Sequence, residues 1–223
     1  MDTLKWLGHA SFEIKAGGKR KENEVGNGQL PTIIYLDPYE GEYRDKADLV
    51  LMTHSHPDHC DPRKMQRILK EGTLVIAPSE CAKAAGADAK SLKPGETFKF
   101  GPIEIKAVEA YNNKRFRSPG IPFHPKGFGV GYLITMRGRT IYHAGDTDYI
   151  PEMKRLGKIH LALLPCGGFY TMDVREAKEA VLAIKPEIFI PMHRREAEME
   201  EFRDVEKSGI KLVMLKQGEE FAI

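Results

Sequence analysis

The chain has 223 residues, 41% of them hydrophobic and 30% charged, which is enough apolar material to bury one sizeable core. Its 34 lysine and arginine residues nearly balance 32 acidic residues, and the formal net charge of +2 favours neither nucleic acid nor a membrane surface as a partner. The apolar runs are far shorter than the roughly 20 residues that a membrane-spanning helix needs.

The cysteine content and the first residues of the chain indicate a compartment. The three cysteines are scattered and odd in number, so we expect no disulfide framework. Residues 1–6 lack the basic and then apolar layout of a signal peptide. Because thiols persist in reducing compartments, we expect a cytoplasmic protein.

Short apolar runs bounded by glycine, proline and polar residues predict strands, and longer stretches with one apolar face predict helices. The first part of the chain contains predicted strands at 4–7, 10–14, 32–36, 48–52 and 73–77, a polar hairpin tip at 17–28, and predicted helices at 62–70 and 79–85. The middle contains predicted strands at 97–100, 102–110, 128–136 and 140–142. The last part contains predicted strands at 160–164, 187–190 and 211–215, and predicted helices at 174–184 and 196–207.

This order of elements predicts the fold class, because strands and helices alternate at both ends while strands alone fill the middle. Two mixed sheets packed face to face with helices outside, an α+β sandwich of four layers (αββα), would accommodate it. The sequence contains no internal repeat and no low-complexity segment. We therefore expect a single domain covering residues 1–223.

The segment 53–61 carries three histidines and an aspartate directly after an apolar strand, at His54, His56, Asp58 and His59. Extended residues two apart share a face, so His54 and His56 should point the same way. Pro57 then forces a turn that brings the other two side chains toward a second point. Imidazole and carboxylate are zinc ligands, so the segment is a candidate metal loop. A chance cluster in a solvated loop is the alternative.

Further candidate ligands follow other predicted strands or bends: His9, His124, Asp146 and His193. Gly145 allows the sharp bend that would end a strand before Asp146. Taken singly, each histidine could be an ordinary surface residue and Asp146 a turn aspartate. The joint pattern favours a metal site.

Together these motifs resemble the metallo-β-lactamase superfamily. They appear in the order typical of it: His54-x-His56-x-Asp58-His59, then His124, Gly145-Asp146 and His193. Segments 6–12, 36–38 and 142–147 resemble the branch that includes ascorbate-6-phosphate lactonase and N-acyl phosphatidylethanolamine phospholipase D. The resemblance extends over about residues 4–221.

The resemblance implies an αββα sandwich with a binuclear metal site. It implies that the first ion is held by His54, His56 and His124, that the second is held by Asp58, His59 and His193, and that Asp146 bridges them. Two divalent ions, Zn²⁺ before Mn²⁺ or Fe, could share a hydroxide, because ions about 3.5–4 Å apart lower the pKa of bound water to roughly 7. Their charge would also stabilise a developing oxyanion. The predicted catalytic residues are Asp58, which could also carry a proton, and Asp146.

Two positions depart from related patterns. His56 is not the glutamate found in the flavodiiron type, which argues against oxygen reduction. Arg194 and Arg195 follow the last histidine, where close relatives in the branch tend to carry an aromatic residue and a glycine. The pocket wall beside the second metal should therefore differ.

Three basic side chains are candidate substrate contacts: His9, Lys114 and Lys126. The two lysines flank His124 and could bind a phosphate or carboxylate. His9 could contact substrate or orient a metal ligand. A solvated loop with ordinary charges is the alternative for 111–117. We interpret Cys166 as a packed small residue, and the glycines that follow it suggest a close backbone approach to the site.

The sequence therefore predicts a binuclear metal-dependent hydrolase acting on a small, anionic ester, lactone or phosphodiester. One alternative is a mononuclear iron dioxygenase on the same fold, in which Asp58, His59 and His193 would be bystanders. Another is a non-catalytic protein stabilised by its metal. We expect a small-molecule substrate, no nucleic acid or membrane partner, and edge strands that could support a homo-oligomer.

Overall fold

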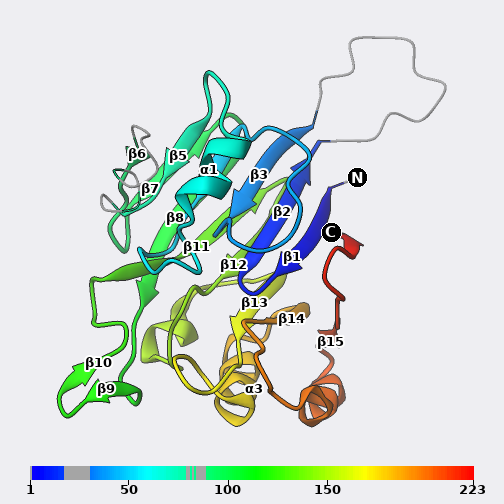
Figure 1. Cartoon of the computed structure of the whole chain (residues 1–223). Helices are drawn as coiled ribbons and strands as arrows, with labels where there is room; N and C mark the ends of the chain where they lie inside the picture. The colour runs from blue at the N-terminus through cyan, green and yellow to red at the C-terminus, as the bar shows by residue number, and fades with distance from the viewer. Residues whose placement is uncertain (1, 18–30, 79–80, 82, 84–88) are drawn as a thin grey trace. The chain divides into compact units, whose positions relative to one another are not determined.

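The computed structural model describes residues 2–17, 31–78, 81, 83 and 89–223 (Figure 1). These residues belong to two compact units. The first comprises residues 1–91 and 215–223, so the chain ends in the unit in which it begins, and the second comprises residues 92–214. Each unit contains one mixed seven-stranded sheet.

Seven strands form the sheet of the first unit: β1 (Thr3–Gly8), β2 (Ser11–Ala16), β3 (Thr32–Leu36), β4 (Leu49–Leu51), β5 (Leu74–Ile76), β6 (Ala89–Lys90) and β16 (Glu220–Ala222). Their order is β16-β1-β2-β3-β4-β5-β6, and Figure 1 shows β1, β2 and β3 side by side in blue. Neighbours from β16 to β3 are antiparallel, and those from β3 to β6 are parallel. Every residue of β4 is buried, as expected for a central parallel strand.

The helix α1 (Pro62–Ile68) begins where the metal loop predicted after β4 ends. Asp61 caps it by accepting a hydrogen bond from the Arg63 N–H, and Pro62 occupies its first turn, where no intrahelical donor is needed. Met65 and Ile68 are fully buried in one core with side chains of β4 and β5. Because the strand and the helix are both anchored, the loop between them has two fixed ends.

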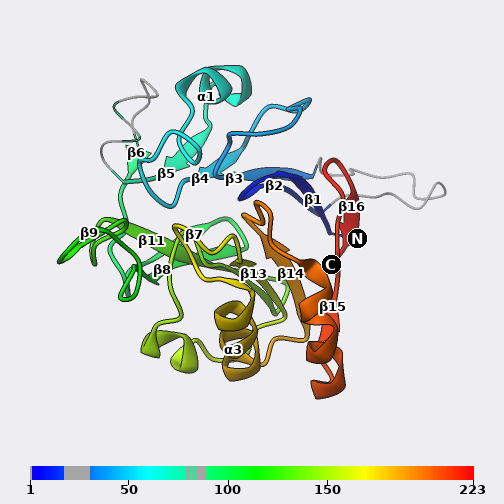
Figure 2. The ribbon, with the colours of Figure 1, turned by 60° about the horizontal axis from the view of Figure 1, so that its bottom comes forward.

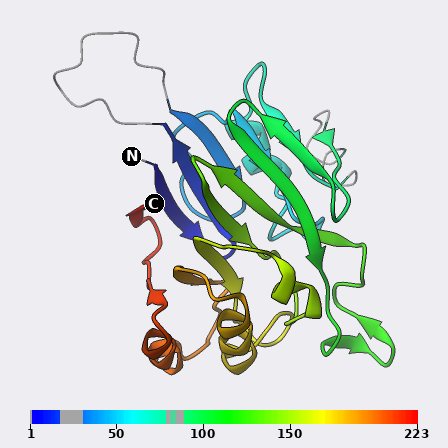
Figure 3. The same ribbon diagram turned by 180° about the vertical axis from the view of Figure 1, so that it is seen from behind.

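Seven strands also form the sheet of the second unit: β7 (Thr97–Phe100), β8 (Ile103–Ala110), β11 (Gly129–Met136), β12 (Arg139–His143), β13 (Leu161–Pro165), β14 (Ile188–Met192) and β15 (Lys211–Leu212). Their order is β15-β14-β13-β12-β11-β8-β7. From β12 to β15 neighbours are parallel, and from β7 to β12 they are antiparallel. Figure 3 shows the long green strands β8 and β11 side by side. A separate two-stranded ribbon consists of β9 (Phe116–Ser118) and β10 (Ile121–Pro122).

The helix α3 (Val174–Ile184) has the bounds that the sequence predicts. Asp173 caps its N-terminus through the Glu176 N–H, and Lys185 ends it in the left-handed conformation. Its buried face, at three- and four-residue spacing, comprises Val174, Ala177, Ala180, Val181 and Ile184.

Two 3-10 helices complete the second unit, η1 (Pro151–Arg155) and η2 (Met199–Ser208). The predicted helix 196–207 corresponds to η2, which Figure 2 shows in orange beside α3. Its hydrogen bonds join residues three apart, as between the Gly209 N–H and the Glu206 carbonyl at 3.0 Å. The two buried side chains, Phe202 and Val205, have the same spacing, so three residues per turn place both against the core.

The α+β class with two mixed sheets is confirmed, and every strand predicted from the sequence is present. The sequence did not predict β6, β9, β10, η1 or β16, none of which exceeds five residues, because such short segments show no clear period. The predicted hairpin tip 17–28 and helix 79–85 lie largely outside the described residues. No helix in the described ranges is long and apolar enough to cross a membrane. The single domain stays a prediction.

We expect η2 to depend on the burial of Phe202, because 3-10 helices have weak intrinsic stability. The Phe202 ring packs edge-on against Phe189 of β14, with centroids 5.0 Å apart. Phe202→Ala should lower the free energy of unfolding by about 3–5 kcal/mol in a urea titration. The exposed control Glu200→Ala should change it by less than about 0.5 kcal/mol. Equal losses in both variants would contradict the role assigned to Phe202.

Candidate metal centre

The candidate ligands of the first unit lie in the loop between β4 and α1. The His59 N–H donates to the His56 carbonyl at 3.0 Å, so the chain turns at Pro57 as predicted. His54 Nε2 and His56 Nδ1 lie 3.2 Å apart, which confirms that these two side chains point the same way. His54 and His59 are buried, and their ring centroids are 4.1 Å apart.

The fully buried carboxylate of Asp37, directly after β3, organises this loop. Its Oδ1 accepts a hydrogen bond from the Thr53 N–H. Its Oδ2 accepts from the Thr53 hydroxyl and from His59 Nδ1, and all three distances are 2.7 Å. These donors compensate the buried charge and tie the end of β3 to the loop after β4.

The same contacts determine which imidazole nitrogens carry protons. His59 Nδ1 must be protonated to donate to the Asp37 carboxylate. The Thr53 hydroxyl already donates its proton to Asp37, so it accepts from His54 Nδ1 at 3.0 Å. In both imidazoles Nε2 therefore has the lone pair that a metal ligand needs.

His9 lies beside this loop, in the bend between β1 and β2. Its Nε2 is 3.2 Å from Asp58 Oδ2, and ligand atoms of His9, Asp58 and His59 all lie within 4.8 Å of one another. Trp6 Nε1 donates to the His9 carbonyl at 3.0 Å and so fixes the bend. His9 can thus orient Asp58 or exchange a proton with it.

The candidate ligands of the second unit are His124, Asp146 and His193. Asp146 follows β12 and His193 follows β14, on either side of the parallel strand β13, so both lie at the carboxyl edge of the sheet. His124 precedes β11. Asp146 Oδ2 is 3.5 Å from His124 Nε2 and 3.3 Å from His193 Nε2, and all three residues are buried.

The spacing of these atoms fits a metal. Two ligand atoms bound to one tetrahedral ion at about 2.0–2.1 Å lie about 3.3–3.4 Å apart. The distances from His54 to His56, from His124 to Asp146 and from His193 to Asp146 are 3.2, 3.5 and 3.3 Å. The first unit therefore presents two nitrogen donors, and the second presents nitrogen and carboxylate donors, at the separation of ligands around one ion.

Backbone strain occurs at three positions in or beside these clusters. The φ angles of His9, Asp37 and His193 are 50°, 41° and 47°, in the left-handed region that side chains with a Cβ seldom adopt. A Cβ at Gly167 would lie 2.5 Å from the His193 carbonyl. The close backbone approach expected after Cys166 is therefore present.

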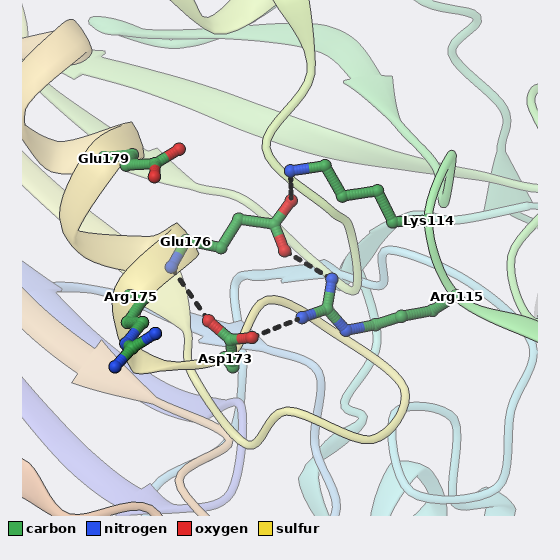
Figure 4. A pocket seen from close by; sticks show the side chains of 6 residues that line it. All are labelled: Lys114, Arg115, Asp173, Arg175, Glu176 and Glu179. Carbon is green, nitrogen blue, oxygen red and sulfur yellow. Dashed lines mark hydrogen bonds and ion pairs between the residues drawn. The ribbon is translucent and has the colours of Figure 1, made fainter.

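The basic side chains near His124 are engaged by carboxylates. Lys114 Nζ lies 3.1 Å from Glu176 Oε1, and Lys126 Nζ lies 3.0 Å from Glu152 Oε1. Arg115 contacts Glu176 and Asp173, as Figure 4 shows, and is mostly buried. Burial lowers the pKa of Arg115, but hydrogen bonds with Glu176 and Asp148 outweigh that effect and raise it. Substrate contact by Lys114 or Lys126 would require these ion pairs to open.

Sequence reasoning missed Asp37, Thr53 and Asn112, which hold the imidazoles of three candidate ligands. Asp37 stands in a motif that carried the family resemblance, but its partner is 22 residues away. Asn112 accepts a hydrogen bond from His124 Nδ1 at 2.7 Å. Cys166 is buried, and burial raises the pKa of its thiol to about 12, which argues against a nucleophile.

We expect Asp37→Asn to lower the affinity for Zn²⁺ about 10–100-fold, because one amide oxygen cannot accept all three hydrogen bonds. Competition with a chromophoric chelator measures this. The matched control is Asp48→Asn, since Asp48 binds the Ile33 N–H at the other end of β4. The Zn²⁺ affinity of the Asp48→Asn variant should stay within about twofold of the wild-type value. An unchanged affinity in Asp37→Asn would contradict the role assigned to Asp37.

Comparison with known proteins places these motifs in a family. A family model described as the beta-lactamase superfamily domain matches residues 3–193. A UPF0173 metal-dependent hydrolase from Thermoplasma acidophilum is 42% identical over 202 residues, which cover 86% of this chain and 84% of that protein.

Solved structures agree. A protein described as a metal-dependent hydrolase from Parabacteroides distasonis is similar with a TM-score of 0.83 and 33% identity, covering 98% of this chain and 94% of the other. A metallo hydrolase from Ignicoccus hospitalis is similar with a TM-score of 0.75 and 27% identity, covering 100% and 99%. The chain therefore belongs to the β-lactamase superfamily and, within it, to the family of UPF0173 metal-dependent hydrolases.

Proposed function

We propose that this hydrolase uses two divalent metal ions to cleave a small anionic ester, lactone or phosphodiester with water. In this proposal one ion would be held by His54, His56 and His124, the other by Asp58, His59 and His193, and both by Asp146. The observation that carries the proposal is the ligand-like spacing of donors within each unit. Nitrogen and carboxylate donors suit Zn²⁺, and they would also accept Mn²⁺ or Fe²⁺.

The residues of the chain would have distinct tasks. When bound, the ions would supply a Lewis acid and lower the pKa of water to roughly 7. Asp58 has 38% of its side chain accessible, so it can meet both water and substrate. A proton taken from water can pass from Asp58 to His9, 3.2 Å away, or to the leaving group. Asp146, buried between two imidazoles, would remain a ligand.

Arg195 is the strongest candidate for contact with an anionic group of the substrate. It lies two residues after His193, and its guanidinium carbon is 5.2 Å from the Tyr170 ring centroid and 5.9 Å from that of Phe169. Stacking on these rings holds the guanidinium without using its hydrogen-bond donors. Those donors suit a carboxylate or phosphate. Lys114 and Lys126 remain proposed contacts.

Two other functions remain as alternatives to hydrolysis. A mononuclear iron dioxygenase would need only one ligand set, so Asp58, His59 and His193 would have no task. A metal-stabilised protein without activity would need no exposed Asp58 beside His9. Both alternatives predict a different metal content or a different response to substrate.

We also propose a cytoplasmic location. Cys60, Cys81 and Cys166 are all buried thiols, which suits a reducing compartment.

The metal content tests the proposal. Protein purified without chelator should contain two transition-metal ions per chain by elemental analysis. His54→Ala should lose at least one of them, because it removes a buried nitrogen donor. Asp146→Ala should lose metal and at least about a hundredfold in kcat/KM on a panel of lactones and phosphodiesters, since the centre is worth several kcal/mol.

The control His160→Ala should retain both ions, because His160, directly before β13, forms its hydrogen bond with Glu187. Wild-type protein without stoichiometric metal would overturn the proposal. One iron per chain with oxygen uptake would indicate the dioxygenase, and stoichiometric metal without turnover on the panel would indicate a stabilising role.

Arg195→Gln tests the anionic substrate. We expect KM for bis(p-nitrophenyl) phosphate to rise roughly 10–100-fold with little change in kcat, because a charge-assisted contact of about 1.5–3 kcal/mol is lost. Hydrolysis of the neutral p-nitrophenyl acetate should change less than about twofold. The control Arg203→Gln should change neither, since Arg203 lies in η2 and pairs with Glu200. Equal effects on both substrates would contradict an anion contact.

A further inference from the structure

Asn112, between β8 and β9, is buried, and its side chain makes four hydrogen bonds. Its side-chain oxygen accepts from the His124 N–H at 2.9 Å and from His124 Nδ1 at 2.7 Å. Its amide nitrogen donates to Asp148 Oδ1 and to the Tyr170 carbonyl, both at 3.0 Å. These two acceptors determine the orientation of the Asn112 amide. If the amide were reversed, its oxygen would face the Asp148 and Tyr170 oxygens, and its NH₂ group would face the two N–H groups of His124.

Asp148, which accepts a hydrogen bond from the Asn112 amide, is fully buried. Its Oδ2 accepts from the backbone N–H groups of Asn113, Lys114 and Arg115 at 2.8, 2.7 and 3.2 Å. Its Oδ1 accepts from Arg115 Nη1 at 2.7 Å as well as from Asn112. Each Asp148 oxygen is thus fully engaged as an acceptor, and the Arg115 guanidinium balances the buried charge.

Arg115 is itself held on its far side. Figure 4 shows its guanidinium between the carboxylates of Glu176 and Asp173, both at the start of α3. Its Nε donates to the Gly168 carbonyl at 2.9 Å. Arg115 is therefore committed to this buried network.

We propose that Asn112 is a positioning residue for the metal ligand His124, and that Asp148 and Arg115 lock it in that role. The inference rests on the proposed metal centre. Asn112 keeps the proton of His124 on Nδ1, so that Nε2, 3.5 Å from Asp146 Oδ2, carries the lone pair. Asp148 is two residues after Asp146, so one short segment places a ligand and the support of another ligand.

The position requires asparagine rather than the carboxylate found at Asp37. The side chain must accept from His124 and donate to Asp148, and only an amide does both in this geometry. Aspartate would place a second carboxylate 3.0 Å from Asp148 Oδ1 and opposite the Tyr170 carbonyl. The resulting repulsion would turn the side chain away from His124.

Two nearly isosteric variants test the proposal. We expect Asn112→Asp to weaken Zn²⁺ binding about 10–100-fold in a chelator competition, and to change the visible absorption of the Co²⁺-substituted protein. Asp148→Asn should act in the same direction. The three backbone N–H groups of residues 113–115 would hold the new amide oxygen at the Oδ2 position, so the new NH₂ group would face the NH₂ group of Asn112. In metal-free wild-type protein, long-range ¹H–¹⁵N spectra should show His124 protonated at Nδ1, and both variants should lose that preference.

The matched control is Phe202→Leu, which loosens the core of the same unit away from Asn112. It should lower the thermal midpoint while leaving Zn²⁺ affinity and the Co²⁺ spectrum unchanged. If the two variants behave like this control, Asn112 is only structural and the inference is overturned. If wild-type protein binds no metal at all, the proposed function fails. If wild type binds two ions and the variants bind as tightly, the inference alone fails.

Discussion

Buried acceptors that hold imidazole Nδ1 atoms are the interaction on which the candidate centre depends. A histidine side chain can rotate about two bonds and can carry its proton on either nitrogen. Asp37 removes both freedoms from His59, and Asn112 removes them from His124. The hydroxyl of Thr53 does the same for His54, because Asp37 has already taken its proton. The candidate ligand atoms are therefore oriented by hydrogen bonds with buried groups of the protein itself.

The groups that hold the candidate ligand imidazoles differ in charge between the two units. In the first, the supporting group is a carboxylate whose charge is compensated by Thr53 and His59. In the second, His124 and His193 already flank the Asp146 carboxylate, and the group behind His124 is a neutral amide. The negative charge there lies one step further back, on Asp148, where Arg115 balances it. Keeping carboxylates apart limits their mutual repulsion in a poorly solvated region.

Much of this could be predicted from the sequence, because the informative signals were local. The loop that contains His54 and His59 follows an apolar strand, and helix α3 has an apolar period and a capping aspartate. The supporting residues were harder to find, since Asp37 and Asn112 act across 22 and 12 residues and look like ordinary turn residues. The basic loop was interpreted from charge alone, and charge does not reveal that Arg115 is buried among acids.

The pairing of β16 with β1 makes the first unit discontinuous along the chain. Thr3, Leu4 and Lys5 meet Ala222, Phe221 and Glu220, so one edge of the first sheet is completed by the last strand in the sequence. During synthesis β1 would have an uncovered edge until β16 has been made, whereas residues 92–214 form a continuous unit. The second unit can therefore assemble before the first sheet is complete, and the loop after β4 acquires its finished sheet only once β16 has paired with β1.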